Sequence, residues 1–317
     1  MGAYLSKRLS YIMIILAAAS LMIFCLYAMT PGDFISSNIK LSAERKAELR
    51  EIYGLNRPVL ERYWTWLTHA LRGDLGYSLA QQRPVLALFN TYIWNSFLLA
   101  VVSTFFTWVI AVIVGVVAAY RQYSWFDTLV MIVIFGAMSI PSFFIGLFLI
   151  KIFAVDLHLL PPGGITTTGS NAVGWAHVQE VIKHMTLPVA VMTLLGTGSL
   201  TRYFRSNMID VIRQDYIRTA RAKGVKESKV LFGHALRNAM LPAITLVGFE
   251  LPALFGGSLI IEKIFNWPGI GQLYIQSFGQ RDYPLLMGFT MLIAILTVIG
   301  TLLSDVLYRI ADPRVKL

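Results

Sequence analysis

The sequence has 317 residues, of which 56% are hydrophobic and only 14% are charged, and its mean hydropathy is +0.64. Soluble globular domains carry about 25% charged residues, so this composition excludes an ordinary soluble enzyme and indicates a polytopic membrane protein. The formal net charge of +10 is compatible with nucleic-acid binding, but the cations must first be assigned to the two sides of the bilayer. The single cysteine, Cys25, excludes a disulfide within the chain and is expected to be a small apolar residue.

The first apolar run covers residues 9–29 and follows Lys7 and Arg8. A helix that rises 1.5 Å per residue crosses a hydrocarbon core of about 30 Å with about 20 residues. Signal peptides have shorter apolar cores, of about 7 to 15 residues, and no small-x-small cleavage pattern follows this one. The run is therefore expected to be an uncleaved membrane span.

A polar insert follows at residues 30–94. The spacing of its apolar residues predicts an amphipathic helix over 58–71. A more charged helix is predicted over 42–53, with Gly54 after it.

Further apolar runs predict five more spans, at 96–119, 128–154, 185–200, 241–261 and 285–308. In the third span, Gly136 and Pro141 predict a kink or a close helix contact. Pro252 in the fifth span indicates that this segment need not be a regular helix. We therefore expect one all-α transmembrane domain over 1–317, with six transmembrane helices.

The charges assign a side to each loop. Six spans place both termini on one side, and that side, with the loops 120–127 and 202–240, carries 15 Lys and Arg against 6 Asp and Glu. The opposite side carries 12 against 11. Because cytoplasmic loops are rich in Lys and Arg, both termini are predicted to be cytoplasmic, and the insert 30–94 and the loop 262–284 to be external. The excess charge then follows from topology, and no nucleic-acid partner is needed.

The loop 202–240 is the main candidate functional segment. Four residues at spacings of three and four predict one less polar helical stripe; they are Ile209, Ile212, Tyr216 and Thr219. Gly224 is suited to a left-handed helix end, and a second helix is expected over 228–238. A basic helix pair of this kind contacts either lipid headgroups or a partner protein, and the pattern alone favours neither.

The residues of this loop resemble the EAA loop of binding-protein-dependent ABC importer permeases. The matching segment is Tyr216, Ile217, Arg218, Thr219, Ala220, Arg221, Ala222, Lys223 and Gly224, followed by residues 234–242. In that family the loop contains the coupling helix, which docks into a groove on the ATPase subunit. The Glu-Ala-Ala of the general pattern is Arg218-Thr219-Ala220 here, and the gap to Leu241-Pro242 is longer. Both departures are similar to the oligopeptide and dipeptide permease branch.

Other segments along nearly the whole chain resemble the same branch. They are Gly73-Asp74-Leu75-Gly76 with Ser78, Leu160-Pro161-Pro162-Gly163-Gly164, Glu262-Lys263-Ile264-Phe265 with Pro268-Gly269-Ile270-Gly271, Arg281-Asp282-Tyr283-Pro284, and the tail Asp305-Val306-Leu307-Tyr308 with Asp312-Pro313. Their order and spacing make the resemblance specific.

The resemblance implies a type I ABC importer permease in a bacterial or archaeal plasma membrane, with no cofactor or metal of its own. It implies a second homologous permease subunit, two ABC ATPase subunits, an external peptide-binding protein and a peptide substrate. Nickel and metallophore importers use closely similar permeases and remain the alternative, because the binding protein largely selects the substrate.

Glu250 lies about midway along the fifth predicted span. A carboxylate at that depth costs about 2.5 to 3.5 kcal/mol on insertion scales, so it is expected to face a cavity or a partner. Two interpretations stay open: it contacts the amino terminus or a basic side chain of a peptide, or the second permease subunit satisfies it.

Function classes other than an ABC permease lack their signatures. The chain contains no Gly-x-Ser-Gly for an intramembrane serine protease, no histidine spacing typical of a metal site and no P-loop for ATP. It is therefore expected to be a non-catalytic subunit. A proton-coupled secondary transporter is a further alternative, but such proteins have inverted repeats and several intramembrane acids, and the sequence shows one central acid and no convincing repeat.

Overall fold

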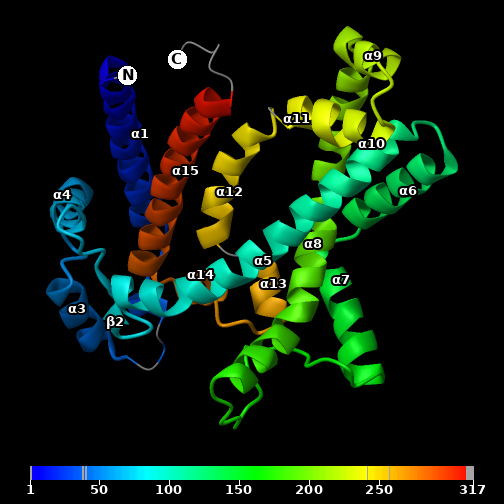
Figure 1. The fold of residues 1–317 in the computed structure, drawn as a ribbon. Coiled ribbons are helices and arrows are strands. Elements are labelled where there is room, and N and C mark those ends of the chain that lie inside the picture. Colours follow the sequence, from blue (N-terminus) through cyan, green and yellow to red (C-terminus); the bar gives the residue numbers. More distant parts are fainter. Residues whose placement is uncertain (1, 38, 40, 241, 257, 312–317) are drawn as a thin grey trace.

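The computed structural model describes residues 2–37, 39, 41–240, 242–256 and 258–311, and these residues are mostly helical. This confirms the all-α prediction. Helices α1 (Gly2–Met29) and α15 (Tyr283–Ala311) lie side by side (Figure 1). An ion pair between Arg8 and Asp305 connects them. Figure 1 also shows that α1 begins, and α15 ends, at the same end of the molecule as the short helices α9 to α11.

Two long helices, α5 (Val85–Tyr120) and α8 (Trp175–Ile212), pack against each other. At Gly115 of α5, an added Cβ would lie 2.9 Å from the Cβ of Phe204. At Gly196 of α8, an added Cβ would lie 2.9 Å from Cγ2 of Thr107. Small residues at these two points let the backbones approach, as is common between membrane helices.

Both long helices exceed the predicted spans. Residues 85–94, which were predicted to belong to the insert, are the start of α5, and residues 202–212, predicted to be loop, are the end of α8. The reason is tertiary burial. Leu88 packs against α14 and α15, while Phe204 and Met208 are fully buried beside other elements. Apolar length therefore underestimates helix length wherever protein, rather than lipid, covers the helix.

The third predicted span is sharply bent. It consists of α6 (Trp125–Ser139), α7 (Ser142–Leu149) and the π-helix η1 (Ile150–Asp156), and the two halves meet at 99°. Pro141 stands at the break and Ile140 before it is extended, because proline lacks an N–H and disfavours helical geometry in the preceding residue. The predicted kink is confirmed, and it is large enough to redirect the chain.

The fifth predicted span is not one continuous helix. Helix α12 (Ile244–Gly256) is followed by the separate helix α13 (Leu259–Ile264). Leu241 and Gly257 lie outside the described residues. Within the described part of the chain, four helices are individually long and apolar enough to cross a membrane, and the bent pair raises the number to five. The predicted count of six is therefore not confirmed, and α12, in the fifth predicted span, has only 13 residues.

Helices α12 and α15 approach each other at a pair of glycines. A Cβ added to Gly248 would lie 2.3 Å from the carbonyl oxygen of Gly300, and one added to Gly300 would lie 2.1 Å from the carbonyl oxygen of Gly248. No larger residue fits at either position without separating the helices.

The insert lies beside the C-terminal part of α1, away from α9 (Figure 1). It contains α2 (Phe34–Ser37), α3 (Ala43–Ile52), α4 (Val59–Ala70) and two antiparallel strands, β1 (Tyr77–Ser78) and β2 (Arg83–Pro84), with Tyr77 opposite Pro84. Both predicted helices are present as α3 and α4. On the buried face of α4, Tyr63 packs edge-on against Phe24 of α1, with ring centroids 5.5 Å apart.

Asp282 ties the hairpin of the insert to the start of α15. This carboxylate is fully buried and accepts hydrogen bonds from the Ser78 hydroxyl and from the backbone N–H of Ala80. Burial raises the pKa of Asp282, and these donors oppose the shift. Two of the motif segments, far apart in the sequence, therefore form a single contact.

Glu262 organises a second polar contact. Its carboxylate accepts hydrogen bonds from the Ser96 hydroxyl at 2.7 Å, from the Gln272 backbone N–H at 3.0 Å and from the Ser258 backbone N–H at 3.2 Å. It thus joins α13, α5 and the first turn of α14 (Ile270–Gln280). At Gly269, an added Cβ would lie 2.4 Å from Oε2 of Glu262. Burial raises the pKa of Glu262 in spite of these donors.

The turn at residues 160–164 docks onto the same region. The Gly164 backbone N–H donates to the carbonyl oxygen of Phe265 at 2.8 Å, and at Gly163 an added Cβ would lie 2.2 Å from that oxygen. The Nδ1 atom of His184, which is buried, lies 2.9 Å from the carbonyl oxygen of Gly163. Close backbone contact therefore requires glycine at Gly163, and a φ of +83° favours it at Gly164.

We predict that Gly248→Val will destabilise the protein, because the side chain must push α12 away from α15. Overpacking of this kind costs about 1–3 kcal/mol and should lower the thermal unfolding temperature in detergent by several degrees. Gly136→Val is the matched control, since nothing lies within 4 Å of a Cβ added there. Equal unfolding temperatures for the two variants would contradict the close contact.

Candidate functional site

The predicted coupling segment forms a separate short helix, α9 (Asp215–Ala222). It begins after α8 ends at Ile212, and a chain reversal follows at Gly224, which has a φ of +72°. The chain continues through α10 (Glu227–Lys229), the π-helix η2 (Val230–Ala235) and α11 (Leu236–Ala239). The predicted second helix over 228–238 is thus present, and a left-handed glycine ends the first helix as predicted.

Ile217 holds α9 against the rest of the protein. It is 0% exposed and packs in a cluster with Val116 of α5, Met208 of α8 and Val230 of η2. Ala220 lies at the edge of the same cluster. Burial of an isoleucine side chain contributes about 1.5–3 kcal/mol, so this contact fixes the helix on the ends of α5 and α8.

The predicted apolar stripe is wrong. Ile209 and Ile212 belong to α8, whereas Tyr216 and Thr219 belong to α9, and the helix breaks between them. Tyr216 and Thr219 are exposed, and the buried position is Ile217. The helix is interrupted at residues 213–214, so the residue of α9 that faces inward is one position later than a continuous helix would place it. The spacing pattern alone gave no sign of this interruption.

The two arginines of α9 differ in their surroundings. The Arg218 side chain is 73% exposed, and it forms a 3.5 Å ion pair with Asp215. Arg221 instead binds Glu227 across the Gly224 turn, with Nη2 2.6 Å from Oε1 and Nε 3.2 Å from both carboxylate oxygens. The hydrogen bond to Glu227 raises the pKa of Arg221. Arg218 therefore faces outward, while Arg221 closes the turn.

The other predicted residues of the segment have defined positions. The Tyr216 hydroxyl accepts a hydrogen bond of 2.9 Å from Nδ2 of Asn238, and Oγ1 of Thr219 donates to the carbonyl oxygen of Asp215 at 2.9 Å. Ala222 and Lys223 are exposed at the end of α9. The structure thus brings Tyr216 to Gly224 together in one short helix and its turn, with most side chains outward.

Arg205 does not contribute to the exposed basic surface, although the sequence places it beside the coupling segment. It lies on α8 and forms a two-pronged ion pair with Asp127 of α6, at 2.6 and 2.7 Å. Asp127 is buried and also accepts a hydrogen bond from the Tyr123 backbone N–H at 2.9 Å. Sequence analysis missed this pair, because 78 residues separate its members.

Glu250 lies on α12 and is half-buried. Trp108 of α5, a residue of this same chain, lies within hydrogen-bonding reach of its carboxylate. Trp108 also packs beside Phe204 and close to Ala243, where α5, α8 and α12 meet. Neither open interpretation of Glu250 included a partner on α5.

Among residues 2–37, 39, 41–240, 242–256 and 258–311, no group of three or more His, Cys, Asp and Glu side chains could hold a metal ion. What the geometry offers is a short exposed helix, fixed at one buried residue to the ends of two long helices.

Residues 111–317 match the family described as the binding-protein-dependent transport system inner membrane component. The chain belongs to this family, and it is therefore a membrane-embedded permease component of a transport system of the ABC importer type.

Two relatives match along almost the whole chain. The oligopeptide transport system permease protein AppB of Bacillus subtilis (strain 168) is 40% identical over 100% of both chains. The glutathione transport system permease protein GsiC of Pectobacterium atrosepticum is 34% identical over 99% of this chain and 98% of its own.

One solved structure shares the fold. The inward-facing MetNI methionine ABC transporter matches with a TM-score of 0.52 and 18% sequence identity, over 72% of this chain and 97% of the matched chain. This likeness confirms the predicted ABC importer permease fold.

Proposed function

We propose that this chain is the transmembrane permease subunit of an ATP-driven peptide importer, in which it forms half of the translocation pathway. The observation that carries the proposal is the 40% identity, over the full length, with an oligopeptide permease. The similarity to a permease for glutathione, which is itself a tripeptide, supports the same substrate class. Import of nickel or a metallophore is the alternative substrate class, and neither of these relatives favours it.

The proposed partners are a second homologous permease subunit, two ABC ATPase subunits and an external peptide-binding protein. ATP hydrolysis belongs to the ATPase subunits, because this chain has no P-loop. The end that carries α9 and the start of α1 is assigned to the cytoplasm, which agrees with its excess of Lys and Arg. The insert and the loop 262–284 are then external, on the side from which a binding protein delivers peptide.

The transport mechanism can be tested with two inhibitors. Peptide uptake by cells or proteoliposomes that contain the complete transporter should stop with vanadate, which traps ABC ATPases, and should persist when a protonophore collapses the proton gradient. The opposite result, uptake that continues in vanadate and stops with the protonophore, would indicate a proton-coupled secondary transporter.

In the proposed coupling step, α9 docks into a groove of an ATPase subunit and passes its movement to the membrane helices. Three observations support this role. The helix is short, its outer face is exposed, and Ile217 connects it rigidly to α5 and α8. Arg218 is the proposed direct contact, since arginine suits two-pronged bonds to carboxylates and helix ends, whereas Arg221 maintains the shape of the turn.

We predict that Arg218→Ala will reduce peptide-stimulated ATP hydrolysis about tenfold, because a hydrogen bond to a charged group contributes about 1.5–3 kcal/mol. The thermal stability of the isolated subunit should be unchanged, since Arg218 is exposed. Lys229→Ala, an exposed cation outside α9, is the matched control. Wild-type stimulation and ATPase assembly in Arg218→Ala, and in a variant that also carries Arg221→Ala, would contradict the docking role.

Glu250 is proposed to contact the peptide amino terminus or a basic side chain in the pathway. Its half-buried position on α12 supports this proposal, while Trp108 supplies a hydrogen bond in the absence of peptide. A carboxylate held by one neutral donor keeps acceptor capacity for a cation.

We predict that Glu250→Gln will slow uptake of peptides with basic side chains more than uptake of neutral peptides. Only the basic peptides lose a contact between the carboxylate and a positively charged side chain. Competition between a lysine-containing and a neutral tripeptide in transport assays measures the difference. Trp108→Phe is the control that removes the intrachain partner and keeps the carboxylate. Unchanged uptake of both peptides in Glu250→Gln would eliminate the role, and an equal loss for both would restrict it to the amino terminus.

A further inference from the structure

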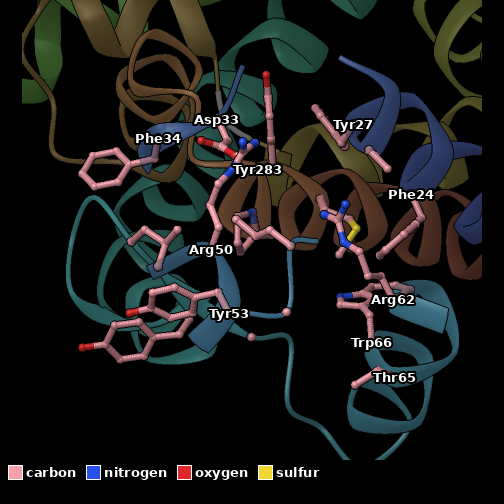
Figure 2. A pocket seen from close by; sticks show the side chains of 18 of the residues that line it. Phe24, Tyr27, Asp33, Phe34, Arg50, Tyr53, Arg62, Thr65, Trp66 and Tyr283 are labelled. Carbon is pink, nitrogen blue, oxygen red and sulfur yellow. The ribbon is translucent and has the colours of Figure 1, made fainter. Parts of the chain in front are cut away.

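A cavity of about 490 Å³ lies where α1 ends, between α1, α4 and the start of α15. None of the roles proposed above uses it. Figure 2 shows its lining residues, with Phe24, Arg62 and Trp66 on one wall and Asp33 and Arg50 on the other. Phe24, Tyr27 and Met287 give it apolar surface at the level where the spans end.

Arg62 is a cation without a matching anion in this cavity. Its guanidinium carbon lies 5.9 Å from the centre of the Phe24 ring, and within the described residues no side chain accepts a hydrogen bond from it. Its half-buried position lowers the pKa of Arg62. Asp33 attracts Arg62 electrostatically. Its carboxylate, however, already accepts hydrogen bonds from Nη2 of Arg50 at 2.8 Å and from the Ser36 backbone N–H at 2.6 Å.

Two further donors of the same cavity lack acceptors. In the part of the chain that the structure describes, Nε1 of Trp66 and Nε of Arg50 are buried and have no hydrogen-bond partner. Trp66 follows Arg62 by four residues, so both side chains project from the same face of α4. Buried donors are nearly always paired in proteins, and a cation flanked by such donors and by aromatic rings suits an anion attached to an apolar body.

The surroundings of the cavity point to lipid as the source of this anion. On α4, Leu60 is 64% exposed and Trp64 is 61% exposed, as in helices that lie at a membrane surface. Helix α1 is a candidate span whose last turn borders the cavity. Arginine pairs with phosphate groups through charge-assisted hydrogen bonds, and the phosphate groups of phospholipids lie at the level where spans end.

We propose that this cavity binds the phosphate group of an anionic phospholipid, with Arg62 and Trp66 as donors and an acyl chain along α1. Bound lipid then joins α4 to α1 and α15, and so steadies the insert on the membrane helices. The proposal requires only that the chain lies in a membrane, and it does not depend on the transported substrate.

The test is lipid binding by the purified, delipidated full chain in detergent. Native mass spectrometry during titration with phosphatidylglycerol should show one tightly held lipid, and phosphatidylcholine, whose headgroup has no net charge, should bind about tenfold more weakly. Arg62→Gln should lower phosphatidylglycerol affinity about tenfold, because it removes charge-assisted hydrogen bonds, and Trp66→Phe should lower it to a smaller extent. Arg72→Gln, which removes an exposed cation just after α4, should have no effect.

Thermal unfolding without lipid, which should be similar in Arg62→Gln and the native chain, shows that the variant is folded. If Arg62→Gln does not fold, Arg62→Lys, which keeps the charge but not the two-pronged geometry, replaces it and should show a smaller loss. The proposal is overturned by equal affinities for the two lipids, or by equal losses in Arg62→Gln and Arg72→Gln. Displacement of the bound lipid by inorganic phosphate or by a short peptide would show that the cavity binds a soluble anion. That result would also overturn the proposal.

Discussion

The burial of Ile217 is the contact on which the proposed coupling depends. A helix of eight residues is too short to be stable alone in water, so α9 depends on tertiary contacts, above all on the side chain of Ile217, which α5, α8 and η2 enclose. The same cluster includes Ala235 and Ala239, which lead toward α12. A displacement of α9 therefore meets packed residues rather than a loose loop, and packed interiors transmit strain.

The membrane part of the molecule combines close contacts with interruptions. A glycine pair, Gly248 and Gly300, brings α12 against α15, and Gly115 brings α5 against α8. Pro141, by contrast, redirects the third span, and α12 ends after 13 residues. Irregular backbone in a membrane is tolerated where protein or a water-filled passage surrounds it. The interrupted segment also carries Glu250, in agreement with the pathway role proposed for it.

At the end of the molecule away from α9, two buried carboxylates hold distant segments together. Glu262 joins α13, α5 and α14 through hydrogen bonds from Ser96, Ser258 and Gln272, and Asp282 joins the hairpin of the insert to α15. Removing one hydrogen-bond donor of such a carboxylate destabilises the protein, because the carboxylate stays buried. These contacts fix the shape of the end that is assigned to the outside. The cavity beside Arg62 lies at the same end.

The sequence by itself determined the helical class, the positions of the apolar runs, the helices α3 and α4, and the family. These properties depend on composition, local spacing and the order of motifs, which a linear chain displays directly. Only the tertiary structure decided that α8 continues to Ile212, that Ile217 and not Tyr216 faces inward, and that Arg205 is paired with Asp127. It also brought Ser96 to Glu262 and Ser78 to Asp282. The physical reason is that burial and pairing depend on residues far away in the chain, and no local pattern records which distant side chain will cover a helix or neutralise a charge.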